Sequence, residues 1–255
     1  MYLDSWALMD ISQDISLREQ FTSLMLYRKG TLRLSAFNLV ELLKLKDKEQ
    51  IESVLTMINS VDAGFINIDF LKVIKREDDT LALKGPGGNL SQELDIIYFY
   101  LLAQNWPEKW SIIDVIRNVL DNNPNEFFRK SWDQFALKMD VFLQSIRSDN
   151  DYITKSKNRS MAMRKEGKKY EAATRELWVF GMDFIFQNQT MLMPSKEWHD
   201  FYHTIVPVAY CHIVLLDKRW TTFISQTGLS FPDIALTFDR RSIGQFLHEL
   251  ETREF

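Results

Sequence analysis

Apolar and polar positions in the first 80 residues follow two alternating spacings. Over 15–28 and 48–61 the apolar residues recur at helical spacing, whereas over 31–36 they alternate with polar residues as in a strand. The same criteria predict strands at 1–3 and 65–68, a helix that begins after Ser35, and a short helix over 69–76. Strands and helices that alternate in this order predict an α/β fold with a central, mostly parallel sheet.

The pattern changes after residue 76. The stretch 76–90 contains acids, a proline and three glycines, which is typical of a linker or loop, and its GPGG lacks the spacing of a phosphate-binding loop. From 91 to 189 the apolar spacing is helical throughout. The α/β pattern then returns after Pro194, with a helix capped by Ser195, strands at 212–216 and 233–238, and a closing helix. The sequence therefore predicts an α/β core formed by 1–80 and 192–255, interrupted by an all-helical insertion over 81–191.

Composition narrows the class of protein. Hydrophobic residues make up 45% of the 255 residues, enough for a sizeable core, and the formal net charge of -4 gives no global signature of nucleic-acid binding. Cys211 is the single cysteine, which excludes an internal disulfide. The N-terminal residues lack a basic segment, and the apolar runs are too short to span a bilayer. We therefore expect a cytoplasmic protein without a membrane partner.

Four acids occupy positions where α/β proteins place chemistry. Asp4 follows the first predicted strand and Asp217 follows the strand at 212–216, while Glu41 and Asp200 lie on neighbouring helices. Functional groups of parallel sheets gather beyond the carboxyl ends of the strands, so these acids are predicted to meet at one sheet edge. Clustered carboxylates repel one another unless a cation neutralises them, and oxygen ligands suit Mg²⁺ or Mn²⁺. Each acid taken singly is equally consistent with a cap, a turn or a surface charge.

The order and context of these acids resemble the PIN-domain family of metal-dependent ribonucleases. The matching segments are YLDS at 2–5, SAFNLVELLKL around Glu41, the D-x-x-H of Asp200 to His203, and VLLDKRW around Asp217. Together they span about 1–76 and 194–255. The resemblance implies a PIN-like three-layer core, here interrupted by the helical insertion.

The resemblance also implies an activity. It assigns Asp4, Glu41, Asp200 and Asp217 as catalytic residues and as ligands of Mg²⁺ or Mn²⁺. The reaction it implies is endonucleolytic cleavage of phosphodiester bonds in single-stranded or structured RNA by a metal-activated water. It leaves open DNA as a substrate, an antitoxin or other protein as a partner, and a homodimer.

Two residues beside the acids have alternative interpretations. Ser5 either supports the acidic site or caps the turn that follows it. His203 either hydrogen-bonds backbone or a carboxylate as a half-buried helical residue, or orients Asp200 without touching the cation itself. His199, next to Asp200, is expected at the exposed surface.

A basic stretch stands out in the helical block. Residues 153–175 contain eight basic residues against two acids, although the whole chain is acidic. By their spacing Lys157, Arg164, Lys168 and Arg175 are expected to share one helical stripe, which would bind RNA phosphates without reading sequence. The alternative is a solvated helix face.

Two other functions compete with a nuclease. Trp6, His212 and Leu216 depart from the family pattern, which favours a catalytically degenerate PIN-like scaffold that binds RNA or a protein through the helical block. The pair His199-Asp200 also suggests an HD-type phosphohydrolase. That class needs a histidine ligand on an upstream helix, and all four histidines lie at or after this pair.

Overall fold

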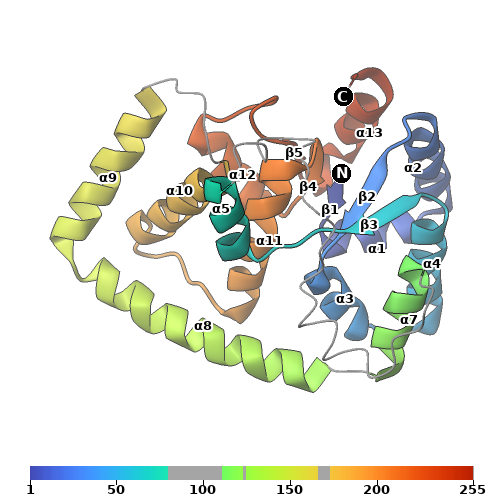
Figure 1. Ribbon diagram of the computed structural model, residues 1–255, viewed down its shortest axis with the longest axis horizontal. Helices are drawn as coiled ribbons and strands as arrows, with labels where there is room; N and C mark the ends of the chain where they lie inside the picture. The colour runs from blue at the N-terminus through green and yellow to red at the C-terminus, as the bar shows by residue number, and fades with distance from the viewer. Residues whose placement is uncertain (80–110, 123–124, 166–172, 255) are drawn as a thin grey trace.

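The centre of the protein is a single five-stranded parallel sheet (Figure 1). The structure, a computed structural model, describes residues 1–79, 111–122, 125–165 and 173–254. The strands lie in the order β3-β2-β1-β4-β5. Their bounds are β1 (Tyr2–Leu3), β2 (Thr31–Leu34), β3 (Asp62–Phe65), β4 (Ile213–Leu215) and β5 (Leu236–Phe238). The predicted α/β class with a parallel central sheet is therefore confirmed.

Helices cover both faces of this sheet (Figure 1). Helices α1, α2, α4 and α13 pack on one face, and α10, α11 and α12 pack on the other. The bounds are α1 (Ser5–Gln13), α2 (Ile15–Tyr27), α3 (Ala36–Leu43), α4 (Lys48–Asn59), α5 (Phe70–Asp79), α7 (Ile112–Asn122), α8 (Asn125–Arg147), α9 (Asn150–Lys165), α10 (Ala173–Gln187), α11 (Ser195–Tyr210), α12 (Lys218–Thr227) and α13 (Ile243–Thr252), with a 3-10 turn η1 (Arg240–Ser242).

The two faces follow from the alternation of side chains along each strand. Tyr2 and Val214 belong to the hydrophobic cluster on the α11 side, whereas Leu3 and Leu215 belong to the cluster on the α1 side. All four are fully buried. A parallel sheet that is apolar on both faces needs a helical layer on each, which produces the three-layer arrangement.

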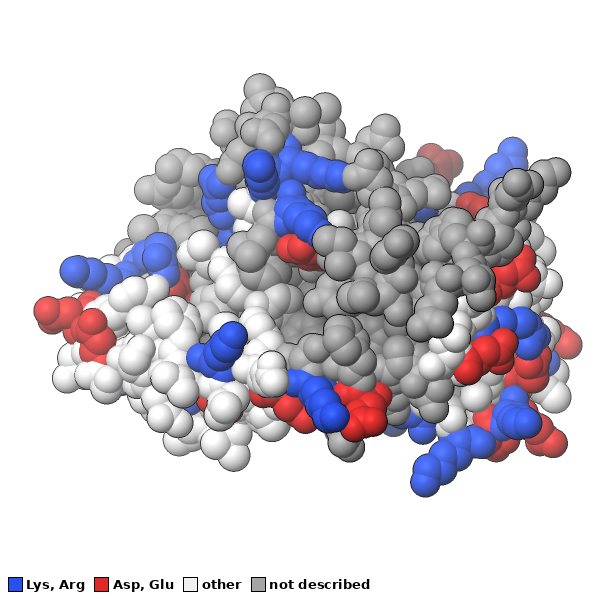
Figure 2. All heavy atoms as spheres, turned by 60° about the horizontal axis from the view of Figure 1, so that its bottom comes forward, with Lys and Arg blue, Asp and Glu red and all other residues white. Residues whose placement is uncertain are grey.

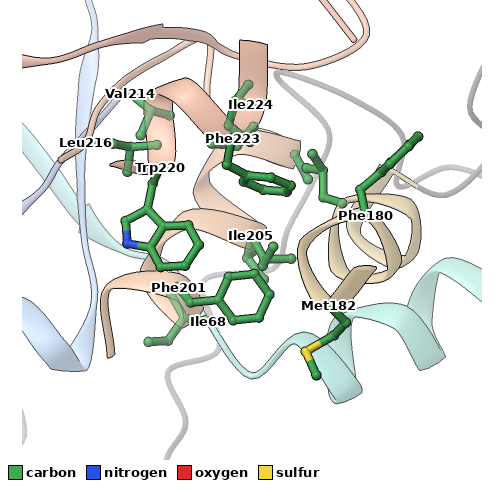
Figure 3. Close-up of a cluster of buried hydrophobic side chains, with 14 of the residues drawn as sticks. Ile68, Phe180, Met182, Phe201, Ile205, Val214, Leu216, Trp220, Phe223 and Ile224 are labelled. Atoms are coloured by element: carbon green, nitrogen blue, oxygen red, sulfur yellow. The ribbon is translucent and has the colours of Figure 1, made fainter. Parts of the chain in front are cut away.

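Aromatic side chains fill the core on the α11 side (Figure 3). The rings of Phe201 and Trp220 lie with centroids 5.2 Å apart, beneath the strand residue Val214. Phe180 and Met182 approach this group from α10, which belongs to the helical block. Helices α8, α9 and α10 of that block thus share one hydrophobic cluster with the sheet, whereas α7 belongs to the cluster on the α1 side.

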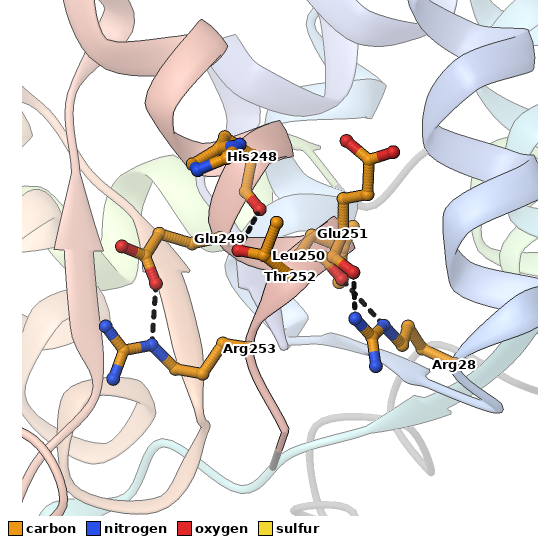
Figure 4. A network of polar contacts seen from close by, with 7 residues as sticks. All are labelled: Arg28, His248, Glu249, Leu250, Glu251, Thr252 and Arg253. Atoms are coloured by element: carbon orange, nitrogen blue, oxygen red, sulfur yellow. Dashed lines mark hydrogen bonds and ion pairs between the residues drawn. The ribbon is translucent and has the colours of Figure 1, made fainter.

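The C-terminal helix α13 is fixed to α2, in the same layer, by a capping arginine (Figure 4). Arg28, at the end of α2, donates to the carbonyl oxygens of Leu250 and Glu251 in the last turn of α13, the former at 3.1 Å. Such carbonyls have no partner within their own helix. Arg28 therefore joins the ends of two helices that are distant in sequence.

Four details differ from the sequence prediction. Helix α1 was not predicted at all, and Asp4, not Ser5, is its N-cap. Strand β3 begins at Asp62, earlier than predicted, because the register with β2 pairs Thr31 with Asp62. Ser195 is the first residue of α11, and the cap position is Pro194. Helix α5 continues to Asp79, into the predicted linker, whose remainder lies outside the described residues.

Candidate functional site

The candidate site lies where the connectivity of the sheet changes direction. From β1 the chain proceeds to β2 and β3 on one side, and it later returns to β4 on the other side of β1. Open α/β sheets bind ligands beyond the strand ends at such a point. Asp4 directly follows β1, and Asp217 follows β4 after one intervening residue. The two strand ends are joined by a hydrogen bond from the amide of Asp4 to the carbonyl of Leu215, at 3.0 Å. The two carboxylates are thus placed beside each other by neighbouring strands.

All four predicted acids line one cavity at this position. Its volume is about 500 Å³. The acids come from separate elements, namely the ends of β1 and β4 and the helices α3 and α11. The complete lining consists of Asp4, Ser5, Trp6, Met9, Glu41, Lys196, His199, Asp200, His203, Asp217, Lys218, Asp239, Arg240 and Arg241.

Asp4 is the most deeply buried of the acids. Only 7% of the residue is exposed, and its carboxylate accepts a hydrogen bond from the amide of Ser5 at 2.6 Å as the cap of α1. Burial, with the charges of Asp217 and Glu41, raises the pKa of Asp4 to about 7, against the opposing hydrogen bond from the Ser5 amide. The Asp4 carboxyl is therefore partly protonated near neutral pH, and binding of a cation would release that proton.

Asp200 behaves in the same way from the other side of the cavity. Burial raises its pKa to about 8, and the charges of Asp4 and Asp217 add to this effect. Lys196, one helical turn earlier on α11, opposes the shift in both Asp4 and Asp200. The pKa of each of these two carboxyls is thus raised in part by the negative charges of the other acids.

Glu41 and Asp217 are half-buried. Glu41 forms an ion pair with Lys44 on the same side of α3, so part of its charge is already compensated. Asp217 occupies the cap position of α12, but its side chain makes no capping hydrogen bond. The carboxylate of Asp217 is therefore not committed to its own helix, unlike that of Asp4.

The chemistry of this donor set fits a divalent cation. Several carboxylates in one partly buried cavity repel one another, and the pKa values of Asp4 and Asp200 are raised first by burial and then by this repulsion. Hard cations such as Mg²⁺ and Mn²⁺ prefer such oxygen ligands. Among the described residues, however, no three His, Cys, Asp or Glu side chains already stand close enough around one point to hold a metal ion. The acids surround the cavity and would have to move inward to ligate a cation.

His203 is fully integrated into the core beneath the cavity. Its Nδ1 lies 2.9 Å from the hydroxyl of Tyr2, and its ring packs on Phe37 with centroids 4.3 Å apart. Burial lowers the pKa of His203 well below its usual range, so the imidazole is neutral. The hydrogen-bond partner of His203 Nδ1 is thus the Tyr2 hydroxyl, which neither of the two alternatives from the sequence had named.

Several cavity residues were not found from the sequence. Asp239 follows β5 as Asp4 and Asp217 follow their strands, so the same rule would have found it. Its carboxylate accepts from the amide of Arg241 at 2.9 Å and thereby begins η1. His199 was expected to be exposed but is half-buried against Phe37 and lines the cavity, where burial lowers its pKa to about 4.

Basic residues form part of the cavity rim. Lys196 and Lys218 lie at the first turns of α11 and α12, and Arg240 and Arg241 belong to η1. Arg240 pairs with Asp10 at 2.7 Å and lies over the Trp6 ring, 5.2 Å from its centroid. Basic groups thus border a cavity with an acidic floor.

Two residues of the predicted basic stripe, Lys157 and Arg175, lie on different helices. Lys157 lies exposed on α9, which ends at Lys165, and Arg175 lies on α10, a second helix packed against α9. Arg164 belongs to α9, and Lys168 lies outside the described residues. On the face shown in Figure 2, the basic and acidic side chains of the described residues are interspersed. Within the described chain, none of these residues lines the cavity.

Comparisons of the chain with protein-family models, with curated proteins and with solved structures found no match. No helix within the described ranges is long and apolar enough to cross a membrane.

Proposed function

We propose that this protein is a metal-dependent nuclease with a PIN-like α/β core. One observation supports the proposal most directly. Acids from four separate elements, Asp4, Glu41, Asp200 and Asp217, line one cavity at the point where the sheet changes direction. The sequence resemblance assigns the same four residues as catalytic acids.

In this proposal Asp4, Asp200 and Asp217 are the main ligands of Mg²⁺ or Mn²⁺, and Glu41 joins them when it leaves Lys44. A divalent cation at this position would activate water and neutralise the charge that builds up as a phosphodiester is cut. Burial of the carboxylates contributes by keeping bulk water from screening the site. Their high pKa values also mean that metal binding would release protons.

The basic rim would hold the substrate. Lys196, Lys218 and Arg241 border the acids, at positions suited to the phosphates on either side of the scissile bond. Contacts of this kind bind the backbone without reading its sequence. RNA is the substrate that the family resemblance favours. The helical block would then shape the path of the strand or bind a protein partner.

The experiment that tests this function is cleavage of a mixed single-stranded RNA in Mn²⁺. Wild-type protein is compared with Asp200→Asn and with Asp121→Asn, which replaces an exposed acid on α7 outside the cavity. We expect wild type and Asp121→Asn to cut at the same rate, and Asp200→Asn to lose at least about 100-fold, as for removal of one catalytic group. Equal cleavage by all three folded proteins would assign the activity to a contaminant or another site.

A degenerate scaffold is the second candidate, and one feature favours it. Trp6 lines the cavity next to Asp4, and the guanidinium of Arg240 lies over its ring. The acids of this cavity, as described, do not stand close enough together to hold a metal ion. A scaffold would bind RNA or protein without using a cation. Under this alternative, millimolar Mn²⁺ leaves the melting temperature of the folded protein unchanged.

A further inference from the structure

A second cavity lies at the ends of α10 and α12 and is separate from the acidic cavity. Its volume is about 400 Å³. Helix α12 connects the two, because Lys218 in its first turn lines the acidic cavity, whereas Gln226 and Thr227 in its last turn line the second cavity. From Lys218 to Gln226 the helix rises by about 12 Å. A strand bound at the acidic cavity would therefore need only to follow α12 to reach the second one.

The lining of the second cavity is polar but uncharged. Among the described residues it consists of three phenylalanines, four side-chain amides of Gln or Asn, and two threonines. The acidic cavity, in contrast, is lined by both acids and bases. A charged group that entered the second cavity would lose water without gaining a counter-ion from its lining, which is costly. The group that fits there is therefore polar and neutral.

The apolar part of this lining is made of aromatic rings. Phe180 and Phe223 are buried, whereas Phe184 is half-buried. The rings of Phe184 and Phe223 lie with centroids 5.5 Å apart. A partly exposed ring offers a face on which another flat ring can stack, and nucleobases stack on such side chains whatever their sequence.

The amides of the lining have hydrogen-bonding groups to spare. Gln189 and Gln226 are exposed, and within the described part of the chain their side chains have no hydrogen-bond partner. Asn188 uses its side-chain oxygen to accept from the Thr190 hydroxyl at 3.2 Å, which leaves its amide hydrogens available. An amide presents a donor beside an acceptor, and the edges of nucleobases carry the complementary pattern.

The loop that carries these amides is held in place by Arg147 of α8. Its Nη2 donates to three carbonyl oxygens, those of Ile185, Asn188 and Met191, at 2.8, 2.7 and 2.9 Å. The backbone amide of Met191 also donates to the carbonyl of Asn188 at 3.0 Å. This side of the cavity is thus formed before a ligand arrives, which reduces the entropy lost on binding.

We propose that the second cavity binds a nucleobase of a single-stranded RNA whose backbone is bound at the acidic cavity. The inference rests on the proposed function, which supplies the strand, and adds a base-binding subsite to it. The base stacks on Phe184, and its polar edge exchanges hydrogen bonds with the amides of Asn188 and Gln226. Stacking accepts any base, so the subsite favours unpaired strands over duplexes, whose bases are already stacked.

The test does not depend on cleavage. Full-length protein is mixed in a chelator with a short single-stranded RNA that carries iodouridine, whose base crosslinks under light to aromatic side chains that it contacts. Mass spectrometry identifies the crosslinked residue. In parallel, the affinity for this RNA is compared with that for an abasic strand of the same length and charge. The variants are Phe184→Leu and Gln226→Met, with Gln20→Met as the matched control, an exposed glutamine of α2 outside the cavity.

We expect a crosslink to Phe184 and tighter binding of the RNA than of the abasic strand. Phe184→Leu should weaken RNA binding at least about fivefold through lost stacking. Gln226→Met should weaken it roughly 2- to 10-fold through lost hydrogen bonds, and Gln20→Met should leave it unchanged. Binding of the abasic strand should be the same in all four proteins.

Two results would overturn the base-binding subsite and leave the proposed nuclease site standing. They are crosslinks confined to residues of the acidic cavity, and equal affinities of wild-type protein for the two strands. No binding of either strand, in chelator or in Mn²⁺, would overturn both proposals. Because Gln226 is exposed, Gln226→Met tests the subsite even if Phe184→Leu does not fold.

Discussion

The hydroxyl of Tyr2 lies 2.9 Å from Nδ1 of His203 and joins the first strand to the helix beneath the acidic cavity. We expect Tyr2→Phe to lower the free energy of unfolding by about 1–3 kcal/mol, because the buried Nδ1 of His203 loses its hydrogen-bond partner while the ring volume is kept. Urea unfolding measures this change. The control is Tyr27→Phe, where the tyrosine is 76% exposed and the change should stay within about 0.5 kcal/mol. Equal effects of the two substitutions would contradict a stabilising role for the buried hydrogen bond between Tyr2 and His203.

The acids of the cavity should make the metal-free protein less stable as the pH rises. The pKa values of Asp4 and Asp200 are raised in the folded state to about 7 and about 8, from about 3.9 in an unfolded chain. The folded state therefore binds more protons between these values, and the free energy of unfolding falls as the pH increases from about 4 to about 8. For the buried Asp4 the loss is on the order of a few kcal/mol.

Thermal unfolding in a chelator at pH 6 and pH 8.5 measures this loss. Asp4→Asn and Asp200→Asn should show a smaller fall than wild type, since the amides do not ionise. Addition of Mn²⁺ to wild type at pH 8.5 should restore stability, by about 2.7 kcal/mol at one hundred times its dissociation constant. A wild-type pH dependence that both variants reproduce would show that other groups control it.

Gly181 lies where α10 crosses α11 without room for a side chain. A Cβ atom at this position would stand 2.3 Å from Cε2 of Phe201. We expect Gly181→Ala to destabilise the protein by about 1–3 kcal/mol through overpacking. Gly244, in α13, has nothing within 4 Å of the corresponding position, and Gly244→Ala should stabilise the protein by up to about 1 kcal/mol through helix propensity. Calorimetry measures both variants. If both substitutions stabilised the protein, or both destabilised it, the close packing of α10 on α11 at Gly181 would be refuted.

Arg28 should be required for the attachment of the C-terminal helix. Arg28→Ala removes the donors to the last-turn carbonyls of Leu250 and Glu251 and should cost about 1–2 kcal/mol. Hydrogen exchange should show earlier opening of α13. Arg253→Ala removes the ion pair with Glu249 on the same helix and the contact with the Phe231 ring, but no bond to a last-turn carbonyl, and should have a smaller effect on α13. If Arg253→Ala opened α13 more readily, the capping role assigned to Arg28 would be wrong.

Local sequence pattern predicted most elements but missed α1. Its apolar residues include Trp6, Ala7 and Leu8 in succession, so no polar face marks it as a helix. Strand β3 was displaced for a related reason. Asp62 and Gly64 disfavour a strand by propensity, and pairing with β2 overrides this preference.

The sequence by itself determined the α/β class, the parallel sheet and the identity of the four acids, because these depend on spacing along the chain and on residue type. Only the tertiary structure decided that the acids line one cavity without standing close around one point, and that His199 lines it with them. It also decided that His203 bonds to Tyr2 and that basic groups of η1 border the acids. Such relationships join residues up to two hundred positions apart, and they are set by strand order and core packing, which no local pattern records.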